Sequence, residues 1–133
     1  MKQQHKQQGF TLLELMVVLV IIGVLAAIVA PRFIDRADEA KVEATRSQMS
    51  GISQALKLYR LHNGHYPGSS ESLNVLVTPG KDGRRYMDSL PKDAWGNDFV
   101  YLSPGVHGDF DLLSYGGDGR SGGSGFDADI GNW

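Results

Sequence analysis

An apolar run of 21 residues near the amino terminus constrains this chain more than any other feature. Residues 10–30 read FTLLELMVVLVIIGVLAAIVA and contain one charged side chain, Glu14. As a helix rising about 1.5 Å per residue, the run can cross the ~30 Å hydrocarbon core of a bilayer. Lys2 and Lys6 precede it. Because positive charge stays on the cytoplasmic side, we expect a single span with a cytoplasmic amino terminus and the rest of the chain across the membrane.

Two simpler interpretations of this run are a secretory signal peptide, cut near Ala27 or Ala30, and an uncleaved membrane anchor. The run is long for the apolar part of a signal peptide. Neither interpretation gives Glu14 a role, although a carboxylate costs roughly 2.5 to 3.5 kcal/mol near a bilayer centre and less toward the interface. Since intramembrane carboxylates are usually functional, Glu14 favours a more specialised segment.

The composition excludes several classes of protein. The chain has 133 residues, of which 41% are hydrophobic, and this suits one modest domain. Thirteen basic and fifteen acidic residues give a net charge of -2 without a dense basic cluster, so nucleic acid is not an expected partner. The absence of cysteine excludes disulfides, thiolate metal sites and cysteine nucleophiles.

Beyond the apolar run, the sequence predicts that the helix continues out of the membrane. Helical spacing resumes after Pro31 and lasts to Asn63, where Gly64 is a natural left-handed cap and Pro67 bars resumption. An apolar face recurs at steps of three and four residues and should hold the globular part. This face comprises Met49, Ile52, Leu56 and Tyr59.

The remaining residues predict a small sheet. A short helix is expected around residues 70–77, between two loops. Residues 99–102 and 110–115 are apolar stretches on either side of a Ser-Pro-Gly turn, so an antiparallel hairpin is expected. The expected fold is α+β: a long amino-terminal helix, with a membrane half and an amphipathic half, packed on a small antiparallel sheet.

The carboxyl-terminal stretch GGDGRSGGSGFDADIGNW has neither helical nor strand periodicity. It mixes seven glycines with three carboxylates, Asp118, Asp127 and Asp129. Gathered carboxylates repel one another, and ordering glycine is costly, so a closed loop needs a cation; oxygen ligands suit Ca²⁺. The EF-hand pattern is absent, because no glutamate closes a twelve-residue loop after Asp118. Spacing alone leaves both a calcium-binding loop and a solvated flexible tail open.

The segment KQQGFTLLELMVVLVIIGVLAAIVAP resembles the leader and helix of the type IV pilin superfamily. Three further segments, YRLHNGHYP, LPKDAWGNDFVYLSPGVHGDFDLLSYGGDG and ADIGNW, are similar to the globular region of the major, G-type pseudopilins of type II secretion systems. The resemblance spans nearly the whole chain. One departure is Ala94, where that family commonly has proline, and it affects only the rigidity of the turn.

The resemblance implies how the amino terminus is processed. A prepilin peptidase in the membrane would cut after Gly9 and methylate the new amino terminus at Phe10. Glu14 would then pair with the free amine of a neighbouring subunit's Phe10 and set the register between subunits, since a buried carboxylate is tolerable when paired.

The resemblance also implies a structural Ca²⁺ in the carboxyl-terminal loop. The ligands would be the side chains of Asp118, Asp127 and Asp129 and the backbone carbonyl of Tyr115.

From the resemblance we expect four parts: a cleaved leader (1–9), a transmembrane and filament-core helix (10–30), its amphipathic continuation (31–63), and a periplasmic globular part (64–133). The chain would lie in the inner membrane and polymerise with itself and with minor pseudopilins into a periplasmic filament that drives export. An inner-membrane assembly platform with a cytoplasmic ATPase would supply the work. The alternative is a type IV pilin for adhesion, motility or DNA uptake; the absence of cysteine and the acidic loop favour the pseudopilin.

An exported enzyme behind a membrane anchor would need a catalytic site. No serine stands in a nucleophile-elbow context, and His62 and His65 have no third metal ligand spaced nearby. Asp109 and Asp111, two residues apart, are typical of one face of a strand near a turn. We therefore expect that the chain is not an enzyme.

Overall fold

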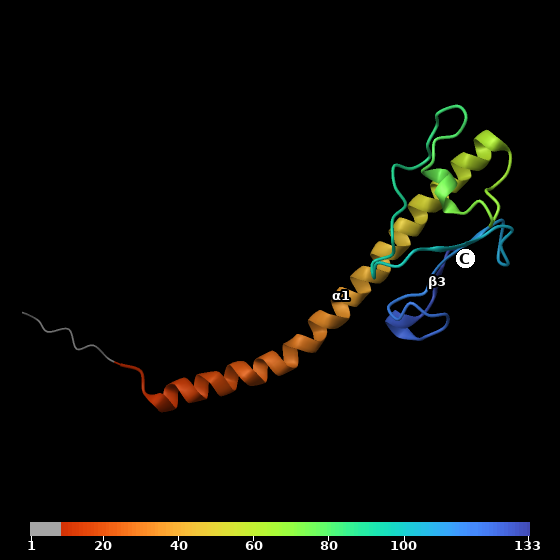
Figure 1. Cartoon of the computed structure of the whole chain (residues 1–133). Helices are drawn as coiled ribbons and strands as arrows, with labels where there is room; N and C mark the ends of the chain where they lie inside the picture. The colour runs from red at the N-terminus through yellow and green to blue at the C-terminus, as the bar shows by residue number, and fades with distance from the viewer. Residues whose placement is uncertain (1–8) are drawn as a thin grey trace, which may run out of the picture. The chain divides into compact units, whose positions relative to one another are not determined.

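The structure is a computed structural model that describes residues 9–133. The predicted leader, residues 1–9, lies outside the described residues except for Gly9. The chain divides into two compact units, Met1–Ala37 and Asp38–Trp133, and one helix, α1, contributes to both. The second unit contains the sheet (Figure 1). It also contains the hydrophobic core.

Helix α1 spans Leu12–Asn63 and contains 52 residues. Pro31 lies inside it without ending it, although a proline deprives the preceding turn of one backbone donor. The helix ends where the sequence predicts. Gly64 adopts a φ of 81°, and its N–H donates to the Arg60 carbonyl oxygen at 2.7 Å. Glycine takes this left-handed conformation without the steric penalty of a β-carbon, and it therefore caps the helix.

A three-stranded antiparallel sheet follows in the order β1-β2-β3. The strands are β1 (Val100–Leu102), β2 (Asp111–Ser114) and β3 (Ile130–Gly131). Val100 lies opposite Leu113, so the predicted hairpin is confirmed. Ser114 lies opposite Ile130, which pairs the carboxyl-terminal stretch with β2. The sequence did not indicate this third strand, because two residues are too few to show a period.

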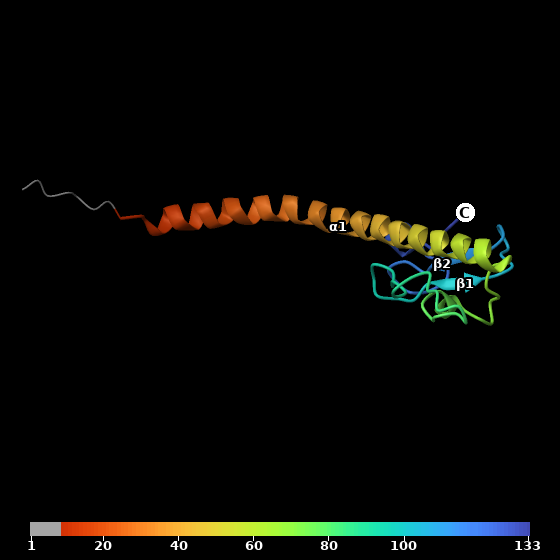
Figure 2. The same ribbon diagram turned by 90° about the horizontal axis from the view of Figure 1, so that it is seen from above.

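The predicted apolar face of α1 forms one side of the core. Its four residues, Met49, Ile52, Leu56 and Tyr59, are all buried. They form one cluster with buried side chains from the sheet and loops: Leu73, Leu76, Phe99, Phe110, Leu112 and Ile130. Figures 1 and 2 both show the sheet beside the carboxyl-terminal end of α1, and Figure 2 labels β1 and β2 there. The expected α+β packing of a long helix on a small antiparallel sheet is therefore confirmed.

The segment between α1 and β1 contains one short helical turn. The helix expected around residues 70–77 is a 3-10 turn, η1 (Leu73–Leu76). It cannot begin earlier, because Ser72 has a φ of 59°, outside the helical region. The Leu76 carbonyl oxygen accepts the N–H groups of Tyr86 and Met87 at 2.9 and 3.0 Å, which fastens the following loop to this turn.

Candidate functional site

Thr11 and Glu14 form a reciprocal cap at the start of α1. Glu14 Oε2 accepts the Thr11 backbone N–H at 3.1 Å and the Thr11 hydroxyl at 3.3 Å. In return, the Thr11 hydroxyl oxygen accepts the Glu14 N–H at 3.2 Å. This is a capping box, which satisfies two donors that a helix start leaves unpaired. The sequence interpretation missed it, although threonine followed three residues later by glutamate is its signal.

The first unit presents an apolar surface. Every described side chain from residue 10 to residue 33 is exposed in the single chain, and Phe10 is 84% exposed. By length and composition, α1 can cross a membrane. Aliphatic side chains exposed around a whole helix are typical of a helix surrounded by lipid or by other helices. With Glu14 at its start, this surface is the candidate assembly site.

The candidate calcium ligands lie in the loop between β2 and β3. Asp118 is exposed, and its Oδ1 accepts a backbone N–H at 2.9 Å. Asp127 is exposed at the end of a 3-10 turn, η2 (Gly125–Asp127). Asp129 is half-buried just before β3, and Tyr115 is half-buried just after β2. Within residues 9–133, no three His, Asp or Glu side chains gather closely enough to hold a metal ion.

Backbone hydrogen bonds close this loop. The Gly117 N–H donates to the Phe126 carbonyl oxygen at 3.0 Å, and the Asp129 N–H donates to the Gly122 carbonyl oxygen at 3.2 Å. The Gly122 N–H donates back to Asp129 Oδ2 at 3.0 Å. Asp129 is therefore the carboxylate that the closed loop holds in place.

The other oxygen of Asp129, Oδ1, is buried and has no hydrogen-bond partner among residues 9–133. A buried carboxylate oxygen without a donor or a cation is costly. Backbone carbonyls crowd the same loop: a β-carbon at Gly116 would lie 2.7 Å from the Ala128 carbonyl oxygen. One carboxylate with several backbone carbonyl oxygens is a donor set that suits Ca²⁺. Asp129 is therefore the residue at which the loop is compatible with such an ion, and calcium binding and the roles of Asp118, Asp127, Asp129 and Tyr115 stay predictions.

Asp93, which sequence reasoning did not single out, is a buried hydrogen-bonding centre. It is 4% exposed. Its Oδ1 accepts the backbone N–H groups of Trp95 and Asn97 at 3.0 and 2.8 Å, and its Oδ2 accepts the Ser114 hydroxyl at 2.7 Å. The signal was the Asp-Ala-Trp-Gly-Asn turn, because aspartate commonly accepts backbone N–H groups of the residues that follow it.

The same network links α1 to the acidic loop. On one side, the Ala94 N–H donates to the buried Thr45 hydroxyl oxygen on α1 at 3.1 Å. On the other, the Ser114 hydroxyl oxygen accepts the Gly116 N–H at 3.2 Å, where the acidic loop begins. Hydrogen bonds from the neighbouring residues Asp93 and Ala94 thus connect the helix with the start of the loop within the second unit.

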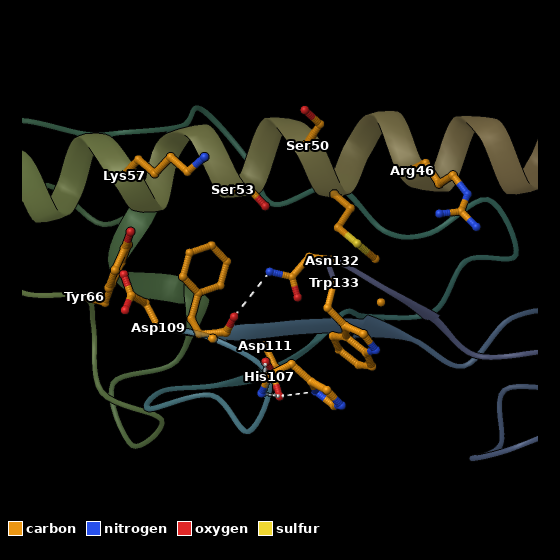
Figure 3. Close-up of a pocket in the computed structure, with 14 residues that line it drawn as sticks. Arg46, Ser50, Ser53, Lys57, Tyr66, His107, Asp109, Asp111, Asn132 and Trp133 are labelled. Carbon is orange, nitrogen blue, oxygen red and sulfur yellow. Dashed lines mark hydrogen bonds and ion pairs between the residues drawn. The ribbon is translucent and has the colours of Figure 1, made fainter.

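A groove of about 600 Å³ lies between α1 and the carboxyl-terminal residues (Figure 3). Arg46, Ser50, Ser53 and Lys57 line it from α1. Across from the helix, the rings of His107 and Trp133 are stacked, with centroids 3.8 Å apart and planes at 7°.

Two carboxylates in the groove are already engaged, and in different ways. Asp111 accepts the N–H groups of Val106 and His107 at 2.8 and 3.1 Å, and the His107 ring Nδ1 lies 3.0 Å from Oδ2. Burial acts to raise the pKa of Asp111, but these hydrogen bonds outweigh it and the pKa is lowered. Asp109 lies before β2 rather than in it, and forms an ion pair with Arg60 at 2.9 Å. Each of the two carboxylates therefore has a different partner.

The two histidines near the end of α1 pack against aromatic rings. The centroid of His62 lies 5.8 Å from that of Tyr86, and the centroid of His65 lies 6.0 Å from that of Tyr59. Both histidines thus contribute to the packing around the helix end.

The amino terminus is similar to a known family. Residues 4–30 match the family model of the prokaryotic N-terminal methylation motif. This stretch includes Gly9, Phe10 and Glu14. Together with the exposed apolar half of α1, the match defines a class: subunits with a prepilin-type amino terminus.

The rest of the chain identifies the family. Residues 32–133 match the model of type II secretion system protein G. The type II secretion system core protein G of Pseudomonas aeruginosa is 47% identical, with 98% of each chain covered; that of Vibrio cholerae is 44% identical, with 100% of this chain and 96% of the relative covered. The crystal structure of the major pseudopilin from the type 2 secretion system of enterohaemorrhagic Escherichia coli is 33% identical, with a TM-score of 0.62, over 75% of this chain and 92% of that chain. The chain belongs to the type II secretion system protein G family of major pseudopilins, which confirms the predicted family and favours it over the type IV pilin alternative.

Proposed function

We propose that this chain is the major structural subunit of a type II secretion pseudopilus. The first half of α1 holds the subunit in the inner membrane, with the amino terminus cytoplasmic and the unit Asp38–Trp133 periplasmic. Subunits polymerise through α1 into a periplasmic filament that drives protein export across the outer membrane. The observation that carries this proposal is the fully exposed apolar half of α1, which carries a single carboxylate at its start.

The subunit acts by assembling and performs no catalysis itself. A prepilin peptidase cuts after Gly9 and methylates Phe10, and minor pseudopilins join the filament. An inner-membrane platform with a cytoplasmic ATPase supplies the work of extraction. Asp109 and Asp111 each have a partner of their own, Arg60 and His107, which supports a structural role for both carboxylates.

The proposal is tested by producing the full chain with and without a prepilin peptidase in cells that contain the assembly platform. We expect a mature chain that begins at Phe10, carries one methyl group and forms filaments visible by electron microscopy, only when the peptidase is present. The intact mass and amino-terminal sequence report the processing. A chain cut near Pro31, or uncut under both conditions, would make this an exported or anchored protein instead.

We further propose that the acidic loop binds one structural Ca²⁺. Asp129 Oδ1, buried without a hydrogen-bond partner, supports this, and Asp118, Asp127 and the Tyr115 carbonyl are the proposed additional ligands. A bound cation would neutralise the carboxylates and join the two sides of the loop, a fastening for which a chain without cysteine has no disulfide. The loop would then be held by the metal as well as by its backbone hydrogen bonds.

Calcium titration of the full chain in detergent tests this site. We expect Ca²⁺ to raise the thermal unfolding midpoint and EGTA to reverse the rise, because an ion that binds only the folded state stabilises it. Asp129→Asn should abolish the response. The control, Asp98→Asn, changes an exposed aspartate that pairs with Lys92 outside the loop, and it should respond like the unsubstituted chain. If millimolar Ca²⁺ gives neither binding heat nor a shift in the midpoint, the loop is not a calcium site.

A further inference from the structure

The end of α1 carries an asparagine that is followed directly by a glycine. The chain has four asparagines, at positions 63, 74, 97 and 132, and Asn63 alone precedes glycine. An Asn-Gly pair is the most reactive of its kind, because glycine has no β-carbon to keep its backbone nitrogen away from the asparagine side chain. Both residues are exposed, and a β-carbon at Gly64 would meet nothing within 4 Å. Water can therefore reach the pair.

The reaction open to this pair is loss of the side-chain amide as ammonia. The Gly64 backbone nitrogen gives up its proton and attacks Cγ of Asn63, and the new C–N bond closes a five-membered succinimide ring. The bond from Cγ to Nδ2 breaks, and Nδ2 leaves as ammonia with the proton that Gly64 lost. Water then opens either of the two ring C–N bonds and returns a proton to the nitrogen. The products are aspartate and isoaspartate.

Hydrogen bonds restrain both reacting groups in the folded chain. The Gly64 N–H donates to the Arg60 carbonyl oxygen at 2.7 Å, so the proton that must leave is engaged. The Asn63 Nδ2 donates to the Tyr59 carbonyl oxygen and to the Tyr86 hydroxyl oxygen, each at 2.9 Å, so the side-chain amide is held in place. The pair can react only after these bonds open. Helix ends open more easily than helix interiors, so such opening is expected.

Tyr86 is the partner of Asn63 that comes from outside the helix. The Tyr86 backbone N–H donates to the Leu76 carbonyl oxygen at 2.9 Å, and the centroid of its ring lies 5.2 Å from that of Tyr59. These two contacts position the hydroxyl that accepts the hydrogen bond from Asn63. The bond between Asn63 and Tyr86 therefore joins the end of α1 to the loop that follows η1.

We propose that Asn63 is a site of spontaneous deamidation, and that its hydrogen bond to Tyr86 sets how fast the folded chain reacts. The product weakens the link between α1 and the loop that follows η1. A carboxylate cannot donate to the Tyr59 carbonyl oxygen, and its negative charge lies at a helix carboxyl terminus, where the helix dipole disfavours it. Isoaspartate also adds a carbon to the backbone next to the Gly64 cap. This modification does not depend on whether the chain assembles into a filament.

Peptide mapping of the full chain tests the site. The chain is kept in detergent at pH 8, sampled over time and digested with trypsin, and mass spectrometry follows the peptide 61–81. This peptide contains both Asn63 and Asn74, whereas Asp82 and Asp118, which also precede glycine, lie outside it. We expect deamidation at Asn63, at least tenfold slower than in the chain unfolded in guanidinium chloride. Asn74 is the internal control and should react at least tenfold less than Asn63 in the unfolded chain.

Removing the Tyr86 hydroxyl tests what sets the rate. Tyr86→Phe keeps the ring and should speed deamidation of Asn63 in the folded chain by about two- to tenfold, the change expected from losing one hydrogen bond. The matched control, Tyr115→Phe, removes a hydroxyl just after β2 and should leave the rate unchanged. In guanidinium chloride both variants should react as fast as the unsubstituted chain.

The consequence for the fold is measured with a variant that carries the charge of one product. Asn63→Asp should lower the thermal unfolding midpoint of the full chain in detergent, whereas Asn74→Asp, the same change at an exposed position in η1, should not. Equal midpoints for these two variants would overturn the proposed weakening of the helix end. No reaction at Asn63 in any sample, equal rates in the folded and unfolded chain, or equal rates for folded Tyr86→Phe and Tyr115→Phe would overturn the proposal as a whole.

Discussion

Asp111 stabilises the loop before β2 in its ionised form, because its carboxylate accepts hydrogen bonds from Val106 and His107. Its pKa is lowered in the folded chain, so this stabilisation is full above the ordinary value of 3.8 and is lost as the pH falls through the folded pKa. We expect Asp111→Asn to lower the unfolding midpoint at pH 7. The difference in midpoint between the variant and the unsubstituted chain should narrow below pH 3.8. Circular dichroism melting of the full chain in detergent measures this difference.

The control for this prediction is Asp88→Asn, since Asp88 is exposed and forms no hydrogen bond or ion pair within residues 9–133. It should leave the midpoint nearly unchanged across the same pH range. If the difference in midpoint between Asp111→Asn and the unsubstituted chain stayed constant down to pH 2.5, the Asp111 side chain would act by its shape and not by its charge.

Ser114 satisfies a buried carboxylate, because its hydroxyl donates to Asp93 Oδ2 at 2.7 Å and both residues are buried. Ser114→Ala leaves that oxygen without its partner, so we expect the free energy of unfolding to fall by about 1 to 3 kcal/mol. Denaturant titration of the full chain in detergent measures it. The exposed Ser89→Ala should change it by less than about 0.5 kcal/mol. Equal effects of the two variants would mean that solvent replaces the Ser114 hydroxyl.

At the scale of elements, α1 is held to the sheet by one face, and the opposite face provides a matched comparison. Leu56 is fully buried, whereas Leu61, on the same helix, is 78% exposed. We expect Leu56→Ala to reduce the free energy of unfolding by about 2 to 5 kcal/mol, because it leaves a cavity as well as losing apolar burial. Leu61→Ala should have an effect within about 0.5 kcal/mol in the same denaturant titration. Similar losses for the two would contradict the assigned core face.

Elements whose residue pattern repeats several times, or which flank a clear turn, could be predicted from the sequence. An element of two residues with neither feature could not. The face of α1 repeats over several turns, and the hairpin flanks a clear turn, so both follow from local pattern. Strand β3 has two residues, and its continuation depends on the Asn132 side chain, whose Oδ1 accepts the Leu112 N–H at 2.8 Å. Such a pairing is decided by a strand some 20 residues away, which local sequence does not contain.

The residues of the candidate sites also differ in whether a contiguous stretch of sequence was enough to find them. Glu14 and the acidic loop stand in contiguous stretches whose composition was enough to single them out, whereas Gly9 and Phe10 were singled out by the resemblance to a family. The Asp93 network and the groove join residues that are far apart in the chain, such as Thr45 with Ala94 and Arg46 with Trp133, and only the fold brings them together. For Asp129, the sequence supplied a carboxylate, and the structure added that one of its oxygens is buried without a partner.

At the scale of the whole molecule and its assembly, Glu14 has two possible roles that a single substitution can confuse. Within the chain, its carboxylate caps α1 through Thr11. Between chains, it would pair with the free amine of a neighbouring Phe10. Glu14→Ala removes both interactions at once. Glu14→Gln separates them, because glutamine also serves in a capping box but carries no charge.

We expect Glu14→Gln to be processed at Gly9 and to keep the helix start, yet to assemble no better than Glu14→Ala. A neutral amide would leave a neighbour's ammonium unpaired in an apolar environment, and removing one partner of a buried ion pair costs about 3 to 5 kcal/mol. That cost would be repeated at every subunit, so filament yield measured by electron microscopy and sedimentation should fall at least tenfold. Thr11→Val, which removes the hydroxyl from the cap but keeps the charge of Glu14, should reduce the yield much less. Full assembly of the Glu14→Gln chain, with failure of Thr11→Val, would instead assign Glu14 to capping alone and remove the pairing with Phe10 from the mechanism.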